Sequence, residues 1–501
     1  MMKKAIKKLL AALLAVAMVC AMAIPAFAYN PGETKEDLNT KHDYGAFQIF
    51  EGVISKDNET LSDVNWGQNI TEPDIFLANL KNDPTIGEKF ETAATAQDVL
   101  AVISKWHDSD DNSIAFARVV CHYLYPDANA NPTPVATDHT GGINIPKSGY
   151  YLIVDTSTFS DDDFYHAYNS FFLLNVPQTP YVVLVNHKVV KPTVEKEVYD
   201  NNDIGSTGGW GSSADHAINE PFQFRLIAKL PASENNGRAY DYYKEYAVCF
   251  TDTLSDGITF DKLDTVEITN GDGSTPQVIN NYTLDPNNPQ SSFKLSIDDV
   301  KTCVPDLNKG ATITVTYTAH LNEKAYVNTV GGGTDNKNSV YLEYSNNPRI
   351  STSLDHTTTS EVCVYTYQLN NTKHQDSENG PVLEGAGFRL YSNEACNAED
   401  EIKLKMNDDG TYSRDFSTEG KGVEMLSNKD GQFNVKGLDA GTYYLKETTP
   451  PTGYSACANK EIVISATHDV NHVDLSGNLS TTIINKKAGG ITLPSTGGIG
   501  T

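Results

Sequence analysis

Three polar side chains occur where apolar residues of predicted strands are expected. Lys196 alternates with Val194 and Val198, and Asp252 and Asn338 fall in the same way among apolar residues of later strands. Successive side chains of a strand point to opposite faces, so each of the three is predicted to face a core. A lone buried ammonium is costly, so these groups must be paired or chemically altered.

Two interpretations fit this middle trio (Lys196, Asp252 and Asn338). In the first, the strand ends are misphased and the three groups are solvated. In the second, burial lowers the pKa of the lysine, whose neutral amine is a nucleophile. A neighbouring acid polarises the asparagine carboxamide, the amine attacks, ammonia leaves, and Lys196 becomes joined to Asn338 by an amide bond.

A second set of residues has the same composition and order. Lys373 lies in phase with Leu369, Glu447 with Leu445, and Asn485 on the last predicted strand. In both sets the lysine comes first, the acid later and the asparagine last. Misphased strand ends do not readily explain the same arrangement twice, so this C-terminal trio (Lys373, Glu447 and Asn485) favours amide formation.

Composition limits the classes of partner and chemistry. The 501 residues carry 38 basic and 65 acidic side chains, a net charge of −27. Such an acidic chain is not expected to bind nucleic acid. No nucleotide-binding, zinc-protease or serine-hydrolase motif occurs, so we expect no enzyme beyond self-directed amide formation, no cofactor and no metal. The cysteines after the leader are scattered and are interpreted as free thiols: Cys121, Cys249, Cys303, Cys363, Cys396 and Cys457.

Residues 1–28 have the features of a secretory signal peptide. A lysine-rich start precedes an apolar run over residues 9–24, and Ala26 and Ala28 provide the small-residue cleavage site. The sequence therefore predicts export.

The remaining chain is predicted to be mainly β, in tandem immunoglobulin-like sandwiches behind an N-terminal α+β domain. Thr95 and Asp98 form a predicted capping box within a helical insertion of that first domain. Strict alternation in Phe222–Leu230 and Ile313–Tyr317 predicts half-buried antiparallel strands in the middle domain. The expected segments after the signal peptide are 29–190, 191–355, 356–488 and a tail at 489–501.

The tail contains Leu493, Pro494, Ser495, Thr496 and Gly497. This run resembles the L-P-x-T-G sorting signal of Gram-positive surface proteins, in which sortase cuts after the threonine and passes its carbonyl to an amine. Pro494 favours an extended chain and Gly497 leaves the bond after Thr496 sterically open. The family's hydrophobic span and basic tail do not follow, so we interpret the sequence as truncated or as lacking that anchor.

Longer stretches resemble the backbone (major) pilins of sortase-assembled pili. Tyr443–Thr448 is similar to the family's E-box, Gly385–Tyr391 to a strand of collagen-adhesin B-type domains, and Phe250–Leu254 to the acid-bearing strand of A-type domains. The resemblance implies an A-type middle domain and a B-type C-terminal domain. It also implies one isopeptide bond in each, formed by the middle trio and the C-terminal trio, with Asp252 and Glu447 as the assisting acids.

The same resemblance implies a polymerising lysine at the end of the first domain. Lys188 matches this position best, although His187 replaces the usual proline, and Lys191 is the alternative. The implied product is a covalent head-to-tail fibre in which Thr496 of one copy is joined to Lys188 of the next.

The implied partners are a pilus-specific (class C) sortase, a housekeeping sortase, other copies of the chain, minor tip and base pilins, and host surface ligands. The implied location is a pilus on the Gram-positive cell wall, with a role in adhesion and colonisation. The alternative function is a monomeric wall-anchored adhesin that binds a host or polysaccharide ligand without polymerising.

Overall fold

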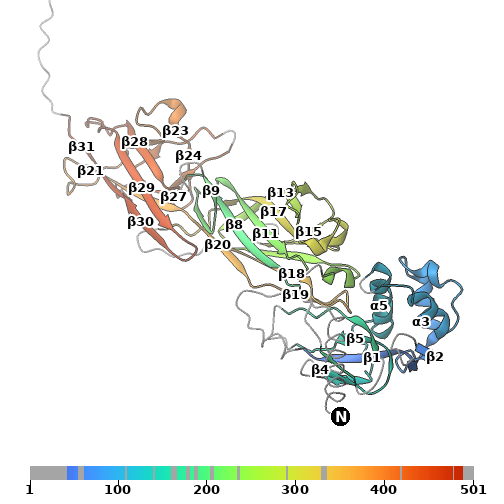
Figure 1. The fold of residues 1–501 in the computed structure, drawn as a ribbon. Coiled ribbons are helices and arrows are strands. Elements are labelled where there is room, and N and C mark those ends of the chain that lie inside the picture. The colour runs from blue at the N-terminus through green and yellow to red at the C-terminus, as the bar shows by residue number, and fades with distance from the viewer. Residues whose placement is uncertain are drawn as a thin grey trace, which may run out of the picture.

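The computed structural model arranges the chain as domains in a row, with the first and third at opposite ends (Figure 1). The signal peptide, Lys188 and residues 493–497 lie outside the described residues. These are 42–54, 61–107, 110–138, 142–159, 166–176, 181–184, 190–202, 208–233, 237–288, 292–328, 336–417, 420–477 and 479–488. None of the helices in these ranges has the length and apolar character needed to cross a bilayer.

The first domain combines a sheet with helices packed against it. The capping box is confirmed, because the Thr95 side chain accepts from the Asp98 backbone N–H while the Asp98 carboxylate accepts from that of Thr95. Residues of the helices share one buried cluster with residues of β1 and β5. The sheet order is β2 (Leu61–Trp66), β1 (Tyr44–Ile54), β5 (Gly149–Asp155) and β6 (Phe172–Val176), with β3 (Ala136–Asp138) beside β1. The other elements are α3 (Pro73–Asn82), α4 (Ala96–Ile103), α5 (Asp111–Leu124) and the pair β4 (Gly142–Ile145) with β7 (Tyr181–Leu184).

The middle domain is a sandwich of two sheets around one core. The predicted alternation is confirmed in β11 and β17, where buried residues occupy every second position. One sheet has the order β14 (Gln277–Val278), β13 (Ile258–Asn270), β17 (Ala311–Leu321), β11 (Pro221–Leu230), β8 (Thr193–Asp200) and β9 (Gly209–Gly211). The other has the order β10 (Ser213–Asp215), β20 (Ser360–Tyr365), β18 (Lys337–Ser345), β12 (Val248–Leu254), β16 (Ser292–Ile297) and β15 (Thr283–Asn288), with β19 (Leu354–His356) beside β18.

The third domain is a smaller two-sheet unit in which β21 and β31 are parallel neighbours. One sheet has the order β24 (Leu404–Met406), β25 (Tyr412–Arg414), β27 (Val435–Leu438), β21 (Tyr367–Gln375) and β31 (Ser480–Asn485). The other has the order β23 (Glu401–Ile402), β22 (Gly387–Tyr391), β28 (Gly441–Thr449), β29 (Lys460–His468) and β30 (Val473–Gly477), with β26 (Met425–Leu426) beside β22.

The end of the middle domain lies further along the chain than residue 355. Strand β20 pairs with β18 of the middle sandwich, and the next strand, β21, starts a sheet of the third domain. The pairing therefore places the transition near Thr366. The last four residues of β20 are all buried, so periodicity alone could not locate the transition.

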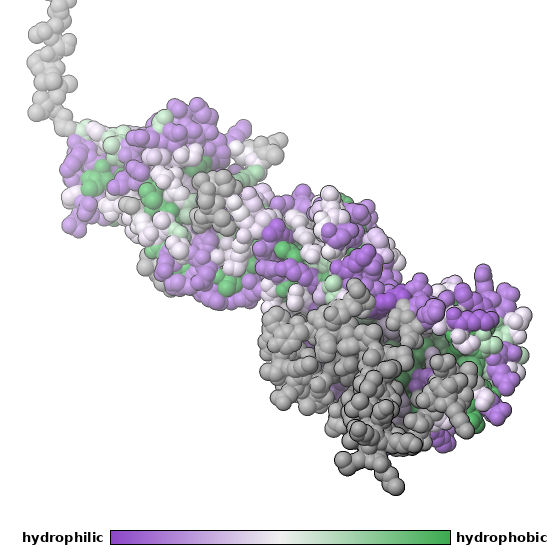
Figure 2. Space-filling view, viewed as in Figure 1, coloured by the Kyte–Doolittle hydropathy of each residue, from purple (hydrophilic) through white to green (hydrophobic). Residues whose placement is uncertain are grey.

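The surface agrees with the acidic composition. In Figure 2, hydrophilic residues cover most of the visible described surface, and hydrophobic residues form small scattered patches. The larger apolar side chains are collected in the cores of the domains.

Candidate functional site

The middle trio meets inside the sandwich. Lys196 lies on β8 of one sheet, while Asp252 on β12 and Asn338 on β18 come from the facing sheet. Lys196 is 2% exposed and the other two are fully buried. The Lys196 Nζ donates to the Asp252 carboxylate. Period-two alternation therefore identified the correct face for all three residues.

Tyr317 on β17 completes this group and was not identified from the sequence. Its hydroxyl accepts from Lys196 Nζ at 3.1 Å and from Asn338 Nδ2 at 2.6 Å, and donates to Asp252 Oδ1 at 3.2 Å. A tyrosine in phase with Ile313 looks like an ordinary core residue. The available signal was that a fully buried tyrosine hydroxyl needs a hydrogen-bond partner.

Burial sets the protonation of the middle trio. It lowers the pKa of Lys196 to about 8, although the Asp252 charge opposes the shift. Burial also raises the pKa of Asp252, against the effect of the Lys196 charge, and raises that of Tyr317 well above its usual value. All three shifts favour neutral groups. A neutral lysine amine is the form that can attack a carbonyl carbon.

One atom of the middle trio has no hydrogen-bond partner. The Asn338 carbonyl Oδ1 is buried and unsatisfied among the described residues. An orphaned buried acceptor costs about 1–3 kcal/mol. The carbonyl oxygen is kept in an amide product, so this cost is shared by the unreacted and the joined states and does not itself drive the reaction.

The C-terminal trio places the lysine amine against the asparagine carboxamide. Lys373 Nζ donates to Asn485 Oδ1 at 2.5 Å, and Asn485 Nδ2 donates to Glu447 Oε1 at 2.7 Å. The same Glu447 oxygen lies 3.7 Å from Lys373 Nζ, and all three side chains are buried. Burial lowers the pKa of Lys373, while the Glu447 charge acts in the opposite direction.

The strand geometry explains how these side chains meet. β21 and β31 run parallel, with Lys373 opposite Ile483 and Gln375 opposite Asn485. Lys373 and Asn485 are therefore diagonal neighbours on one face, within reach of a long side chain. Glu447 reaches them from β28 of the facing sheet.

Two further groups hold the C-terminal trio and were not predicted. The backbone N–H of Cys457 donates to Glu447 Oε2 at 2.7 Å, which fixes the carboxylate from its far side. The Phe388 ring lies 5.6 Å from Lys373 Nζ and covers the amine with an apolar face. A backbone donor in an irregular segment leaves no sequence signal, whereas Phe388 was visible only within Gly385–Tyr391, the stretch that resembles a B-type strand.

The structure does not test the residues predicted to be joined during polymerisation. Lys188 and the sorting motif that contains Thr496 lie outside the described residues, so their roles stay predictions. Lys191, the alternative to Lys188, is described and is half-buried just before β8.

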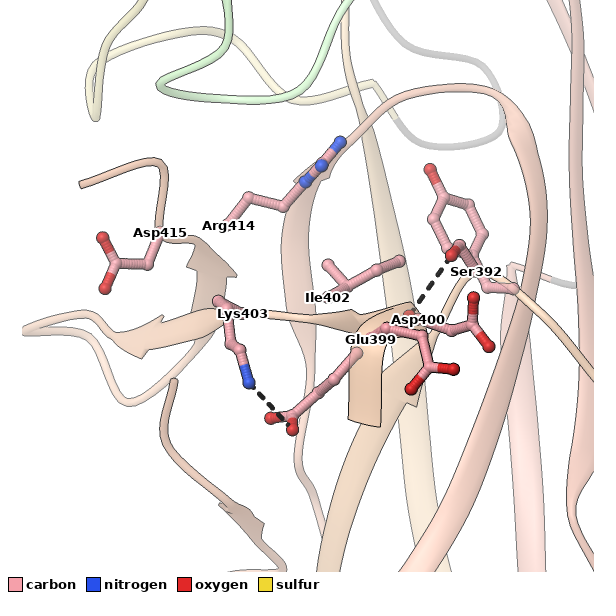
Figure 3. A pocket seen from close by; sticks show the side chains of 9 residues that line it. Ser392, Glu399, Asp400, Ile402, Lys403, Arg414 and Asp415 are labelled. Atoms are coloured by element: carbon pink, nitrogen blue, oxygen red, sulfur yellow. Dashed lines mark hydrogen bonds and ion pairs between the residues drawn. The ribbon is translucent and has the colours of Figure 1, made fainter. Parts of the chain in front are cut away.

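A surface pocket of the third domain contrasts with the buried trios. Its volume is about 320 Å³, and the charged groups in it form local contacts: Lys403 Nζ lies 3.0 Å from Glu401, and Ser392 Oγ donates to the Asp400 carbonyl at 3.2 Å (Figure 3). None of its lining residues belongs to either trio. Both trios are therefore inside the domains and separate from this pocket.

Comparison with known proteins finds a family match within the third domain. Residues 368–478 match the family model described as SpaA, a prealbumin-like fold domain. The third domain is therefore similar to prealbumin-like domains. The match includes Lys373 and Glu447 and ends before Asn485. No protein of curated function matches the chain.

Solved structures similar to the chain include pilins of Gram-positive bacteria. A C-terminal fragment of a major pilin of Streptococcus agalactiae is 20% identical over 59% of this chain and 99% of its own, with a TM-score of 0.42. The full-length major pilin SpaD of Corynebacterium diphtheriae is 21% identical over 69% and 81%, with a TM-score of 0.43. A three-domain backbone pilin of Streptococcus pyogenes is 15% identical over 90% and 97%, with a TM-score of 0.48. Similarity at this level does not establish function, so the functional proposal rests on the two trios.

Proposed function

We propose that this protein is a structural subunit of a covalent surface pilus whose domains are stiffened by internal amide bonds. The observation that carries the proposal is the pair of buried lysine–acid–asparagine trios in successive β domains. One such group could be an isolated ion pair. Two with the same order along the chain fit a repeated chemical function, and the prealbumin-like third domain agrees with it.

The proposed reaction is balanced within each domain. The lysine amine attacks the asparagine carbonyl carbon, a carbon–nitrogen bond forms, and the bond to the carboxamide nitrogen breaks. One amine proton passes to the departing nitrogen, which leaves as ammonia. In the C-terminal trio, Glu447 Oε1 is placed for this transfer because it accepts from the leaving nitrogen and lies 3.7 Å from the attacking one.

The positions of the bonds suit a subunit that carries tension. The Lys373–Asn485 bond would join the first and last strands of the third domain, which are parallel neighbours. A pull entering at β21 would leave through β31 without unfolding the strands between them. The Lys196–Asn338 bond would join the two sheets of the middle sandwich.

Assembly is proposed to use the two chain regions outside the described residues. A pilus-specific sortase would cleave after Thr496 and transfer its carbonyl to Lys188 of another copy, releasing the segment that starts at Gly497. Repetition of this head-to-tail contact gives a filament because the contact does not close on itself. Attachment to the cell wall by a housekeeping sortase, minor tip and base pilins, and adhesion to host surfaces belong to this proposal.

The test is the state of the protein on Gram-positive cells that express it with its pilus sortase. Wall extracts of wild-type cells should give an SDS-resistant ladder, and Lys188→Ala should abolish it while secretion and both internal bonds persist. Lys191→Ala is the matched control, and loss of the ladder only in that variant would move the role to Lys191. A single wall-linked band in the wild type would overturn polymerisation and favour the monomeric adhesin.

A further inference from the structure

Acidic residues and a histidine gather where the middle and third domains meet. Asp200 ends β8 and Asp215 ends β10 in the middle domain, whereas His468 ends β29 in the third. The domains are joined here by direct contacts, including an Ile218 N–H donating to the Gly437 carbonyl at 3.0 Å. The junction lies between β20 and the strands of the third domain (Figure 1).

We propose that Asp200, Asp215 and His468 bind a divalent transition-metal ion, with Zn²⁺ the best fit, that fastens the middle domain to the third. One ligand atom from each residue lies within 4.8 Å of the others. His468 Nε2 is 3.8 Å from Asp215 Oδ2 and 3.9 Å from Asp200 Oδ2. Ligands bound at about 2.0–2.2 Å from one Zn²⁺ are separated by roughly 3–4 Å, so little movement is needed.

One ring nitrogen of His468 lies against a hydroxyl, and the other faces the two carboxylates. Ser213 Oγ donates to the His468 backbone carbonyl at 3.4 Å and lies 2.9 Å from Nδ1. Nε2 lies on the side of Asp200 and Asp215. Metal-bound histidines are held in this way through their other ring nitrogen.

Asp215 supplies an independent sign of a missing ligand. It is fully buried, and its Oδ1 has no hydrogen-bond partner in the described chain. Its Oδ2 accepts from Tyr367 OH at 2.8 Å, and its backbone N–H donates to Asp200 Oδ2 at 3.2 Å. The carboxylate is therefore held through Oδ2, which is also the oxygen 3.8 Å from His468 Nε2, and Oδ1 is the oxygen left to bind a cation.

Asp439 of the third domain lies beside this group. It is also buried, lies within hydrogen-bond reach of Asp215, and accepts from Asn202 Nδ2 at 2.9 Å. One imidazole with carboxylates suits Zn²⁺, whereas Ca²⁺ takes six to eight oxygen ligands.

The experiment uses the full mature chain after removal of metals with a chelator. Titration with Zn²⁺ alone, followed by calorimetry and metal analysis of the dialysed protein, should show one tightly bound ion per chain. Asp215→Asn and His468→Gln should each weaken binding by at least about tenfold. Co²⁺ should give the visible absorption of a tetrahedral site, and Ca²⁺ should not compete.

The matched control is His472→Gln. His472 lies close to His468 along the chain but is exposed and pairs with Asp474 at 2.9 Å. Its loss should leave zinc binding unchanged. Circular dichroism and the ammonia loss of each domain verify that the variants fold, and these readouts do not depend on zinc. Absence of a stoichiometric ion, or binding that survives both ligand variants, would overturn the proposal and leave an imidazolium ion pair at the junction.

Discussion

Replacing Glu447 with glutamine should prevent the bond of the third domain and no other. The glutamine keeps the size of the side chain and can still hydrogen-bond Asn485, but it cannot carry the proton from the amine to the leaving nitrogen. Lys373 and Asn485 are 112 positions apart. Cross-linking a loop of that length removes chain entropy worth about 4.8 kcal/mol from the unfolded state. Loss of the bond should lower the melting temperature of this domain by roughly 20 °C or more.

The assay is intact-mass spectrometry of the mature chain, followed by differential scanning calorimetry. The mass of Glu447→Gln should exceed the mass calculated for the same chain with two bonds, and the difference should be the mass of one ammonia. Its middle domain should melt as in the wild type. Glu461→Gln, which alters an exposed carboxylate on the neighbouring strand β29, is the control and should keep both bonds. Full ammonia loss in Glu447→Gln would refute the role assigned to the acid.

Two further predictions concern the middle trio. Tyr317→Phe removes the hydroxyl that contacts Lys196, Asp252 and Asn338, so the bond should form more slowly in newly synthesised protein. Intact-mass measurements at successive times after induction will show the delay, and an unchanged rate would make Tyr317 a packing residue only. In Asn338→Ala, Lys196 stays an amine with a pKa of about 8 in the folded state, against 10.5 when unfolded. The unfolded chain then binds the extra proton between these values, so the free energy of unfolding should rise by about 3 kcal/mol from pH 8 to 10.5. Urea titrations against Lys196→Met/Asn338→Ala isolate this effect, and equal pH slopes in the two proteins would contradict it.

Alternation along the strands was enough to find both trios. A strand has a side-chain period of two, so Lys196 and Lys373 could be assigned to the buried face without knowing what lay opposite. The same rule could not distinguish Tyr317 from a core tyrosine, because a phenol suits both an apolar face and a polar site.

Other features depend on information that is not local. The middle domain extends to β20 because that strand pairs with β18, and pairing is not visible in one strand's pattern. Asp200, Asp215 and His468 stand at strand ends, where polar residues are ordinary, and His468 meets the two aspartates only because two domains dock. Lys188 and Thr496 remain predictions from sequence resemblance.

The central claim is that both domains carry an internal amide bond, and the intact mass of the wild-type mature protein tests it most directly. The account predicts a mass lower than that of the sequence by two ammonia molecules. Proteolysis should then release branched peptides that join Lys196 to Asn338 and Lys373 to Asn485. A mass equal to that of the sequence, with all four residues recovered in linear peptides, would contradict it.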